Sequence, residues 1–266
     1  IAVYINTIFH APDNYSGAAL LLATFLFGYQ IYCDFSGYTD MARGTARMFG
    51  IYLVNNFNYP YSSKSPIEFW NKWHISLYSW FRDYVYIPLG GSKKGVVRQN
   101  INILFVFALS GLWHGASWNF IVWGLVNAFL VMIARLLQKI KSPEFAGKGI
   151  FFTICTFIAI QLTWIFFRSE SLSDAVNIFQ KIFFENYSYN VFSEVFSNNS
   201  TFAQASIIAS SIIVLEVIQY LTRRNANLWF ITLPRYIRWT FYYVLIFIIL
   251  SFGIDVPQFN FIYFTF

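Results

Sequence analysis

The sequence has little charge. Only 11% of its 266 residues are Asp, Glu, Lys or Arg, whereas soluble domains carry about a quarter. Glycine (14), proline (7) and cysteine (2) are also scarce, which excludes collagen-like chains and disulfide-rich scaffolds. Hydrophobic residues make up 57% and aromatic residues 22%, so the chain is too apolar to remain disordered. This composition indicates an integral membrane protein.

The cysteines and the basic residues exclude two further classes. Cys33 and Cys155 each lie within an apolar run, so no disulfide framework is indicated and the redox compartment stays open. The net charge of +6 comes from basic residues between apolar segments rather than from one stripe. That distribution fits the positive-inside rule better than nucleic-acid binding. The chain begins at Ile1 without a signal-peptide pattern. We expect it to be the C-terminal part of a longer protein.

Five segments are long and apolar enough to be predicted as membrane spans. They are Ala18–Phe35, Trp118–Leu137, Ile150–Phe167, Ala205–Leu221 and Tyr236–Phe252.

A sixth apolar segment is short. Ile101–Trp113 would rise about 20 Å as a helix, less than the ~30 Å hydrocarbon core. We interpret it as a half-span that turns near Gly111–Gly115, and the alternative is a full span that tilts or starts earlier. By the positive-inside rule, residues 168–204, with their Asn- and Ser-rich part at 186–200, and both termini face outward. The loops predicted to face the cytoplasm are 37–100, 138–149 and 222–235. Successive spans then cross the membrane in alternating directions, provided that residues 101–137 enter and leave the membrane on the same side.

The cytoplasmic stretch contains a predicted amphipathic helix. Ser65, Pro66 and Glu68 form a capping-box signature, and Pro88 ends the pattern. At 100° per residue the polar side chains align on one face and the apolar ones on the other. The polar face holds Lys72, Ser76, Ser79 and Asp83, and the opposite face holds Trp70, His74, Leu77 and Phe81. The predicted fold is therefore all-α: one domain over 1–266, a polytopic transmembrane helical bundle with a re-entrant or short-helix hairpin and an interfacial amphipathic helix.

Catalytic signatures typical of water-soluble enzymes are absent, and so is a Cys/His set with zinc spacing. Of the three histidines, His10 is interpreted as a solvated surface residue. His114 lies at the hairpin tip, where an ionisable residue at membrane depth is a functional candidate, and histidine suits general-base chemistry near neutral pH. The alternative is an interfacial histidine bonded to a carbonyl. His74 taken alone suits a satisfied core histidine, but a cavity shared by His74 and His114 is geometrically possible.

Three charged groups have two interpretations each. Asp34 and Asp40, with Arg43 and Arg47, form either an ion-pair cluster at a helix end or, as the alternative, a structural clasp or the lining of a polar substrate channel. The adjacent Arg82–Asp83 pair has the same two interpretations. A third group is interpreted mainly as topogenic, with attraction of an anionic donor as the alternative. It consists of Lys93, Lys94 and Arg98.

Several ordered motifs together resemble the membrane-bound O-acyltransferase (MBOAT) family, in its bacterial alginate O-acetylation branch. The similarity is dense over 32–125 and looser to the C-terminus, and the resemblance implies that the N-terminal half of the family's chain is absent here. The motifs are Asp34–Ala42, Asn56–Tyr61, Glu68–Leu77, Trp80–Gly91, Gly111–Ala116 and Phe261–Phe264.

The resemblance implies an enzyme that moves an acetyl group to hydroxyls of an exopolysaccharide or cell-envelope glycan, directly or through a periplasmic partner. It assigns the catalytic role to His114 and a supporting role to His74, without a metal. It implies acetyl-CoA or an acyl carrier as donor, no tightly bound cofactor, contact with membrane lipid, periplasmic acetylation partners, no nucleic acid, and a multi-pass place in the bacterial inner membrane. D-alanyl transfer to teichoic acid and a non-catalytic acyl conduit or scaffold are the alternatives. Residues expected to bind substrate or support the site are Asp34, Asp40, Trp73, Arg82, Asp83 and Trp113.

Overall fold

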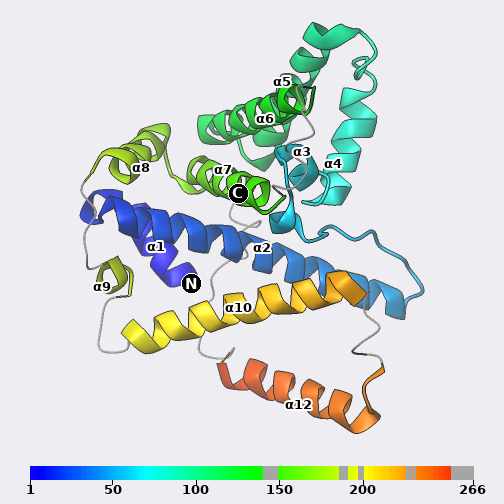
Figure 1. The fold of residues 1–266 in the computed structure, drawn as a ribbon, viewed down its shortest axis with the longest axis vertical. Coiled ribbons are helices and arrows are strands. Elements are labelled where there is room, and N and C mark those ends of the chain that lie inside the picture. Colours follow the sequence, from blue (N-terminus) through cyan, green and yellow to red (C-terminus); the bar gives the residue numbers. More distant parts are fainter. Residues whose placement is uncertain (140–148, 186–190, 197–200, 226–229, 231, 253–266) are drawn as a thin grey trace. The chain divides into compact units, whose positions relative to one another are not determined.

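A computed structural model describes residues 1–139, 149–185, 191–196, 201–225, 230 and 232–252 (Figure 1). Every regular element within these residues is helical, which confirms the all-α prediction. The chain divides into two compact units, residues 1–201 and 202–265. Whether they form the predicted single domain stays a prediction. Three predicted features lie wholly or mostly outside the described residues: the 138–149 loop, the 186–200 loop and the 261–264 motif.

The longest helix of the first unit is α2 (Gly17–Met48). Its 32 residues rise about 48 Å, well beyond the ~30 Å of a hydrocarbon core. The predicted span Ala18–Phe35 is therefore only the first part of this helix. The sequence had indicated that the Asp34–Asp40 segment lies at the end of a helix. In the structure it lies within α2. That segment carries few apolar residues, so it lies outside the predicted span although the helix continues through it.

The predicted single helix from Pro66 to Pro88 is wrong, because the chain breaks in the middle of it. Residues Pro66–Trp70 form α3, Ile75–Phe81 form α4, and a π-helical turn, η3, covers Arg82–Tyr86. At the break His74 has a φ of +47°, in the left-handed region. A helix cannot continue through such a residue.

The start of this region is as predicted. The Ser65 hydroxyl accepts the backbone N–H of Glu68 at 3.2 Å and caps α3. The Glu68 carboxylate accepts the N–H of Lys64 at 2.8 Å and pairs with Lys72 at 2.6 Å. The short α3 is thus held by polar contacts at its first turn.

Helices α5 (Gly95–His114) and α6 (Trp118–Lys139) form the predicted hairpin, but α5 is longer than the predicted half-span. It begins six residues before Ile101, and its 20 residues rise about 30 Å. This length agrees with the alternative, a full span that starts earlier. Arg98, Gln99 and Asn100 separate Val97 from the apolar run, which is why the sequence placed the start at Ile101.

Two glycines allow the backbones of α5 and α6 to touch. A Cβ placed on Gly111 would lie 2.1 Å from the Phe120 carbonyl oxygen, and one on Gly124 would lie 2.1 Å from the Phe107 carbonyl oxygen. Both separations are far below any real Cβ contact, so only glycine fits. Gly111 therefore admits the neighbouring backbone of α6.

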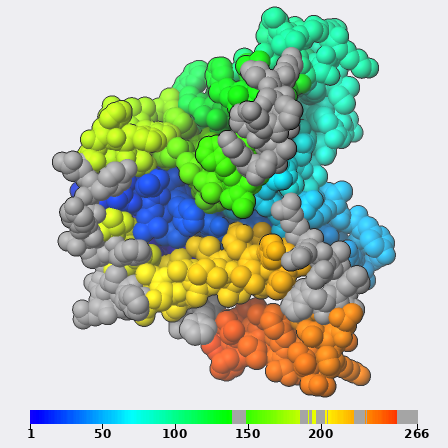
Figure 2. Space-filling view, in the orientation of Figure 1, coloured from blue at the N-terminus to red at the C-terminus, as the bar shows by residue number. Residues whose placement is uncertain are grey.

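Helices α7 (Gly149–Arg168) and α8 (Leu172–Phe184) complete the wall around α2. The Ser171 hydroxyl accepts the N–H of Asp174 at 3.1 Å and caps α8. One face of α8 is buried, and the helix lies directly along the N-terminal part of α2 (Figure 2). The short helices α1 (Ala2–His10) and α9 (Val191–Val195) also contact α2.

The second unit contains α10 (Thr201–Asn225) and α12 (Arg235–Phe252). Within the described residues, five helices are long and apolar enough to cross a membrane: α2, α5, α6, α7 and the Ala205–Thr222 part of α10. The chain is thus a multi-pass membrane protein. The predicted span Tyr236–Phe252 does form a helix, α12, but that helix is not one of the five. The side on which each loop lies stays a prediction.

Candidate active site

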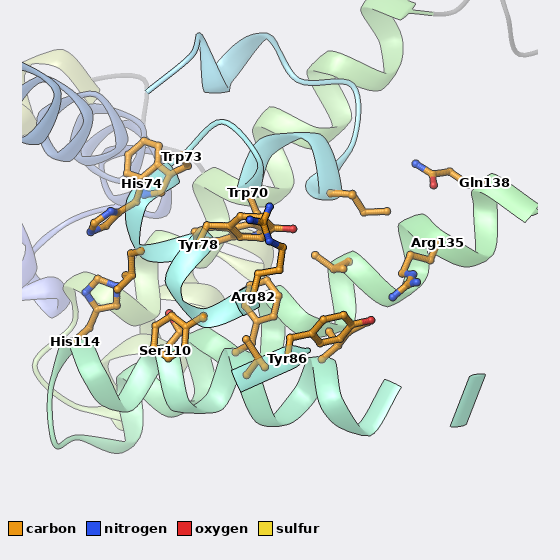
Figure 3. A pocket seen from close by; sticks show the side chains of 17 residues that line it. Trp70, Trp73, His74, Tyr78, Arg82, Tyr86, Ser110, His114, Arg135 and Gln138 are labelled. Carbon is orange, nitrogen blue, oxygen red and sulfur yellow. The ribbon is translucent and has the colours of Figure 1, made fainter. Parts of the chain in front are cut away.

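A cavity of about 390 Å³ lies between the α3–α4–η3 segment and the α5–α6 hairpin (Figure 3). All four residues of the predicted apolar face line it, although they do not belong to one continuous helix: Trp70, His74, Leu77 and Phe81. Their predicted polar counterparts do not line it. The pattern therefore identified the inward face correctly even where it missed the break.

His74 and His114 line this same cavity, as the proposed convergence required. His74 precedes the first residue of α4, and His114 is the last residue of α5. In Figure 3 the two imidazoles lie at one end of the cavity, next to Trp73. The structure thus brings together two histidines that are forty positions apart. Their chemical roles stay predictions.

The His114 imidazole is enclosed by aromatic rings. Its side chain is only 7% exposed. Ring centroids lie 5.0 Å away for Trp113, 5.2 Å for Trp123 and 5.1 Å for Phe167, each in an edge-on arrangement. Rings in these positions fix the plane of the imidazole and keep water from most of its surface.

The His74 imidazole is held in a different way. Its ring lies 4.6 Å from that of Phe35 on α2 and 6.2 Å from that of Trp113. The Ser76 hydroxyl lies 3.5 Å from Nδ1. Burial lowers the pKa of His74 from 6.5 to about 4, so the ring is neutral at pH 7. A neutral imidazole offers one nitrogen as acceptor and one as donor.

The opposite end of the cavity is basic and polar. Arg135 and Gln138 line this part, and Figure 3 shows both far from the two histidines, with Arg82 between the two ends. Arg82 Nε donates to the Asp83 carboxylate at 2.8 Å, so part of its charge is balanced. The cavity therefore has an imidazole end and a guanidinium end.

The remaining predicted site residues separate into two groups. Trp73 lines the cavity and is buried against Trp164, with the ring centroids 5.2 Å apart. Arg82 lines it as well. The other four predicted site residues are not part of the lining: Asp34, Asp40, Asp83 and Trp113.

These four residues have identifiable surroundings. Asp40 pairs with Arg43 at 2.8 Å, which agrees with the ion-pair interpretation, and Asp83 pairs with Arg82. Asp34 is half-buried on α2. Trp113 is 55% exposed, yet its ring contacts both imidazoles.

Residues outside the cavity agree with the plainer interpretations. His10 is exposed, and its Nδ1 lies 2.8 Å from a Glu170 carboxylate oxygen. Lys93, Lys94 and Arg98 are exposed and do not line the cavity. Among the residues that the structure describes, no group of three or more His, Cys, Asp or Glu side chains is arranged to hold a metal ion.

Five polar residues of the lining were not predicted from the sequence: Tyr78, Tyr86, Ser110, Arg135 and Gln138. One of them carried a signal that could have found it. Arg135 lies inside the predicted span Trp118–Leu137, and a charge within a span faces the protein interior or a polar cavity far more often than lipid.

Comparison with known proteins gives a coherent set of relatives. The family model of the membrane-bound O-acyltransferases matches residues 10–173, more than half of the chain. A probable alginate O-acetylase AlgI of Azotobacter vinelandii is 40% identical over 156 residues, covering 58% of this chain and 30% of the relative. A peptidoglycan O-acetyltransferase of Helicobacter pylori is 35% identical over 185 residues, covering 67% and 35%.

A teichoic acid D-alanyltransferase of Bacillus subtilis is 38% identical over 150 residues, covering 52% of this chain and 38% of that protein. The chain thus spans about a third of the length of the curated relatives it matches. The names of these three relatives describe transfer of an acetyl or D-alanyl group, with alginate, peptidoglycan or teichoic acid as the named polymer.

Proposed function

Because the chain belongs to the membrane-bound O-acyltransferase family, we propose that it forms the catalytic part of an enzyme that acetylates hydroxyls of an exopolysaccharide or another cell-envelope glycan. The observation that carries this proposal is the cavity with His74 and His114 at one end and two arginines along its length. Two relatives named for O-acetylation of alginate or peptidoglycan support the acetyl group and the glycan acceptor.

In the proposed reaction His114 is the general base. It takes the proton of the acceptor hydroxyl as the oxygen attacks the carbonyl carbon of an acetyl thioester. The C–S bond then breaks, and the departing thiolate receives the proton from the imidazolium. The carbonyl end of α5 stabilises the positive charge that develops on the ring of its last residue.

His74 has the supporting role. As a neutral imidazole it can donate a hydrogen bond to the oxyanion or orient His114. The aromatic rings around His114 exclude water, which would otherwise compete with the acceptor hydroxyl for the acetyl group.

The donor we propose is acetyl-CoA or an acyl carrier. Both carry phosphate groups, and Arg135 lines the part of the cavity away from the imidazoles, with Arg82 between them. A guanidinium pairs well with phosphate oxygens. A donor whose phosphate lies near Arg135 would point its thioester toward His74 and His114.

The place and the partners are also part of the proposal. We propose that the protein acts in the bacterial inner membrane, with the acceptor glycan reached directly or through periplasmic acetylation proteins. The relatives' names support an acceptor outside the cytoplasm, since alginate and peptidoglycan are envelope polymers.

The test is mass spectrometry of the envelope glycans from cells that carry variants of the full-length protein. General-base help contributes about 10² to 10⁴ in rate, so His114→Ala is expected to abolish O-acetylation at normal expression, and His74→Ala to reduce it. His10→Ala is the matched control, because this third histidine is exposed and outside the cavity. Normal acetylation in His114→Ala would reject the proposal and would favour a conduit whose chemistry lies in a partner.

One relative favours a second candidate, the transfer of D-alanine to teichoic acid. The chemistry at His114 would be the same, and only the acyl group and its carrier would differ. Purified full-length protein offered acetyl-CoA and, separately, a D-alanyl carrier protein distinguishes the two. Turnover of the D-alanyl donor alone would replace acetylation as the function.

A further inference from the structure

The N-terminus of α4 is unusual because its N-cap residue does not cap. The first backbone N–H groups of a helix need acceptors from outside the helix, and a Ser, Thr, Asp or Asn in the β-region normally supplies one. Here the N-cap is His74, with φ +47° and ψ +53° and no side-chain capping bond. Its imidazole faces the cavity instead.

Asn56, eighteen positions earlier in the chain, supplies the missing acceptors. Its backbone carbonyl accepts the N–H of Ile75 at 3.0 Å. Its side-chain Oδ1 accepts the N–H of Ser76, also at 3.0 Å. The first two N–H groups of α4 are therefore both satisfied by this one residue.

The same segment also holds the chain before His74. The N–H of Asn58 donates to the Lys72 carbonyl at 3.0 Å, so residues 56–58 are bonded to the backbone on both sides of the histidine. A left-handed conformation in a residue other than glycine persists only where its surroundings enforce it. These three bonds provide that enforcement at the break between α3 and α4.

Phe57 attaches this segment to the rest of the bundle. Its buried ring lies 5.3 Å from Phe35 and 5.0 Å from Trp73, both edge-on. Phe35 is also the α2 ring that contacts the His74 imidazole, at 4.6 Å. The segment, the left-handed turn and the imidazole are thus tied to one face of α2.

We propose that Asn56 is a positioning residue for His74: it caps α4 in place of the histidine and so leaves the imidazole directed into the cavity. This inference rests on the proposed function, because His74 must contribute to acyl transfer for its orientation to matter. Asn56 acts through the backbone of Ile75 and Ser76 and does not touch the reacting atoms. In its side chain, the carboxamide oxygen is the atom that accepts the backbone N–H of Ser76.

The test compares Asn56→Ala with Asn56→Asp in purified full-length protein. Alanine removes the acceptor for the Ser76 N–H, whereas aspartate keeps an oxygen there, and a carboxylate suits a helix N-terminus. A small misplacement of a catalytic group costs up to about 100-fold. We expect kcat to fall at least about tenfold in Asn56→Ala with KM for the donor unchanged, and to return to within about threefold of the wild type in Asn56→Asp.

Asn58→Ala is the matched control, because Asn58 is exposed and contributes its backbone N–H, which alanine retains. Its kcat is expected to equal that of the wild type. Wild-type kcat in Asn56→Ala, or equal losses in Asn56→Ala and Asn56→Asp, would overturn the proposal.

A double-variant cycle separates positioning from a general effect on folding. If Asn56 acts through His74, Asn56→Ala in a His74→Ala background causes no further loss of kcat. If Asn56 has a purely structural role, Asn56→Ala lowers kcat by the same factor in both backgrounds, even if part of the protein is misfolded. That result would reject the role of Asn56 and leave the proposed function standing. If His74→Ala itself had no effect, the role assigned to His74 in the proposed function would fail instead.

Discussion

The two histidines of the cavity are held by two differently built parts of the molecule. His114 ends a regular helix, α5, whose place is set by backbone contact with α6 at Gly111 and Gly124. His74 lies at a break between two short helices and is held by hydrogen bonds from a remote segment. The position of His114 thus depends on the small volume of two glycines, whereas the position of His74 depends on hydrogen-bond acceptors in a remote segment. Variants that change one property without the other should therefore affect the two histidines differently.

The largest expected difference concerns the imidazoles themselves. His114→Asn is expected to lower kcat by about 10² to 10⁴, because it removes the proposed general base. His74→Asn is expected to lower it by only about tenfold, since asparagine tolerates the left-handed backbone and its amide can still donate a hydrogen bond. Steady-state acetyl transfer by the purified full-length variants measures both. Equal losses would show that the two histidines do not divide the work as proposed.

The next effect tests the hairpin. In Gly111→Ala the new Cβ would lie 2.1 Å from a carbonyl oxygen of α6, so the helices must separate. We expect a loss of unfolding free energy on the order of 3 kcal/mol, seen as a lower thermal midpoint in detergent. Gly37→Ala on α2 is the control, because nothing lies within 4 Å of its Cβ position, and there alanine is expected to be neutral or to stabilise by up to about 1 kcal/mol. Unchanged stability in Gly111→Ala would show that the close contact is not present.

A third effect concerns His74 alone, through its contribution to the pH dependence of stability. Because its pKa in the folded chain is about 4, the unfolded chain binds a proton at this residue from about pH 6.5 downward, whereas the folded chain does not. The free energy of unfolding therefore falls as the pH falls from 6.5 to 4, by on the order of 2 kcal/mol at pH 5 from this group.

His74→Asn removes this contribution and leaves the nearby titratable His114 in place. The difference in unfolding free energy between pH 7 and pH 5 is therefore expected to be smaller in the variant than in the wild type. Equal pH dependence in the two proteins would mean that His74 is not buried as neutral imidazole.

The smallest effect lies at the other end of the cavity. Arg135→Gln is expected to raise KM for the donor about fivefold with kcat unchanged, because a partly solvated ion pair contributes up to about 1 kcal/mol. Arg98→Gln removes an exposed charge outside the lining and should change KM less. A larger effect at Arg98 than at Arg135 would place the donor outside this cavity.

The sequence predicted those parts of the bundle well whose structure depends on a single physical property, such as apolar length or helical periodicity. Long apolar runs identified α2, α6, α7 and the central part of α10, because span length follows from bilayer thickness. The inward face of the interfacial segment also followed from its periodicity. The start of α5 was missed, since Arg98, Gln99 and Asn100 interrupt the apolar pattern between Val97 and Ile101.

The break at His74 could not be predicted for a different reason. Residues 67–87 contain neither proline nor glycine, and the local signals describe one helix. The left-handed turn comes from bonds between residues 56–58 and 72–76, which become adjacent only in the folded chain. The pair of histidines was nevertheless found, because an ionisable residue in so apolar a chain is rare enough to be noticed.

The central claim is that two imidazoles face one cavity in which the donor thioester meets the acceptor. An experimental structure of the full-length protein with a non-hydrolysable acetyl thioether analogue of the donor tests it most directly. The account predicts that the acyl carbon lies within hydrogen-bonding reach of His114 and His74, with the phosphate of the analogue near Arg135. An analogue bound elsewhere, with the imidazoles packed against protein and no ligand between them, would contradict it.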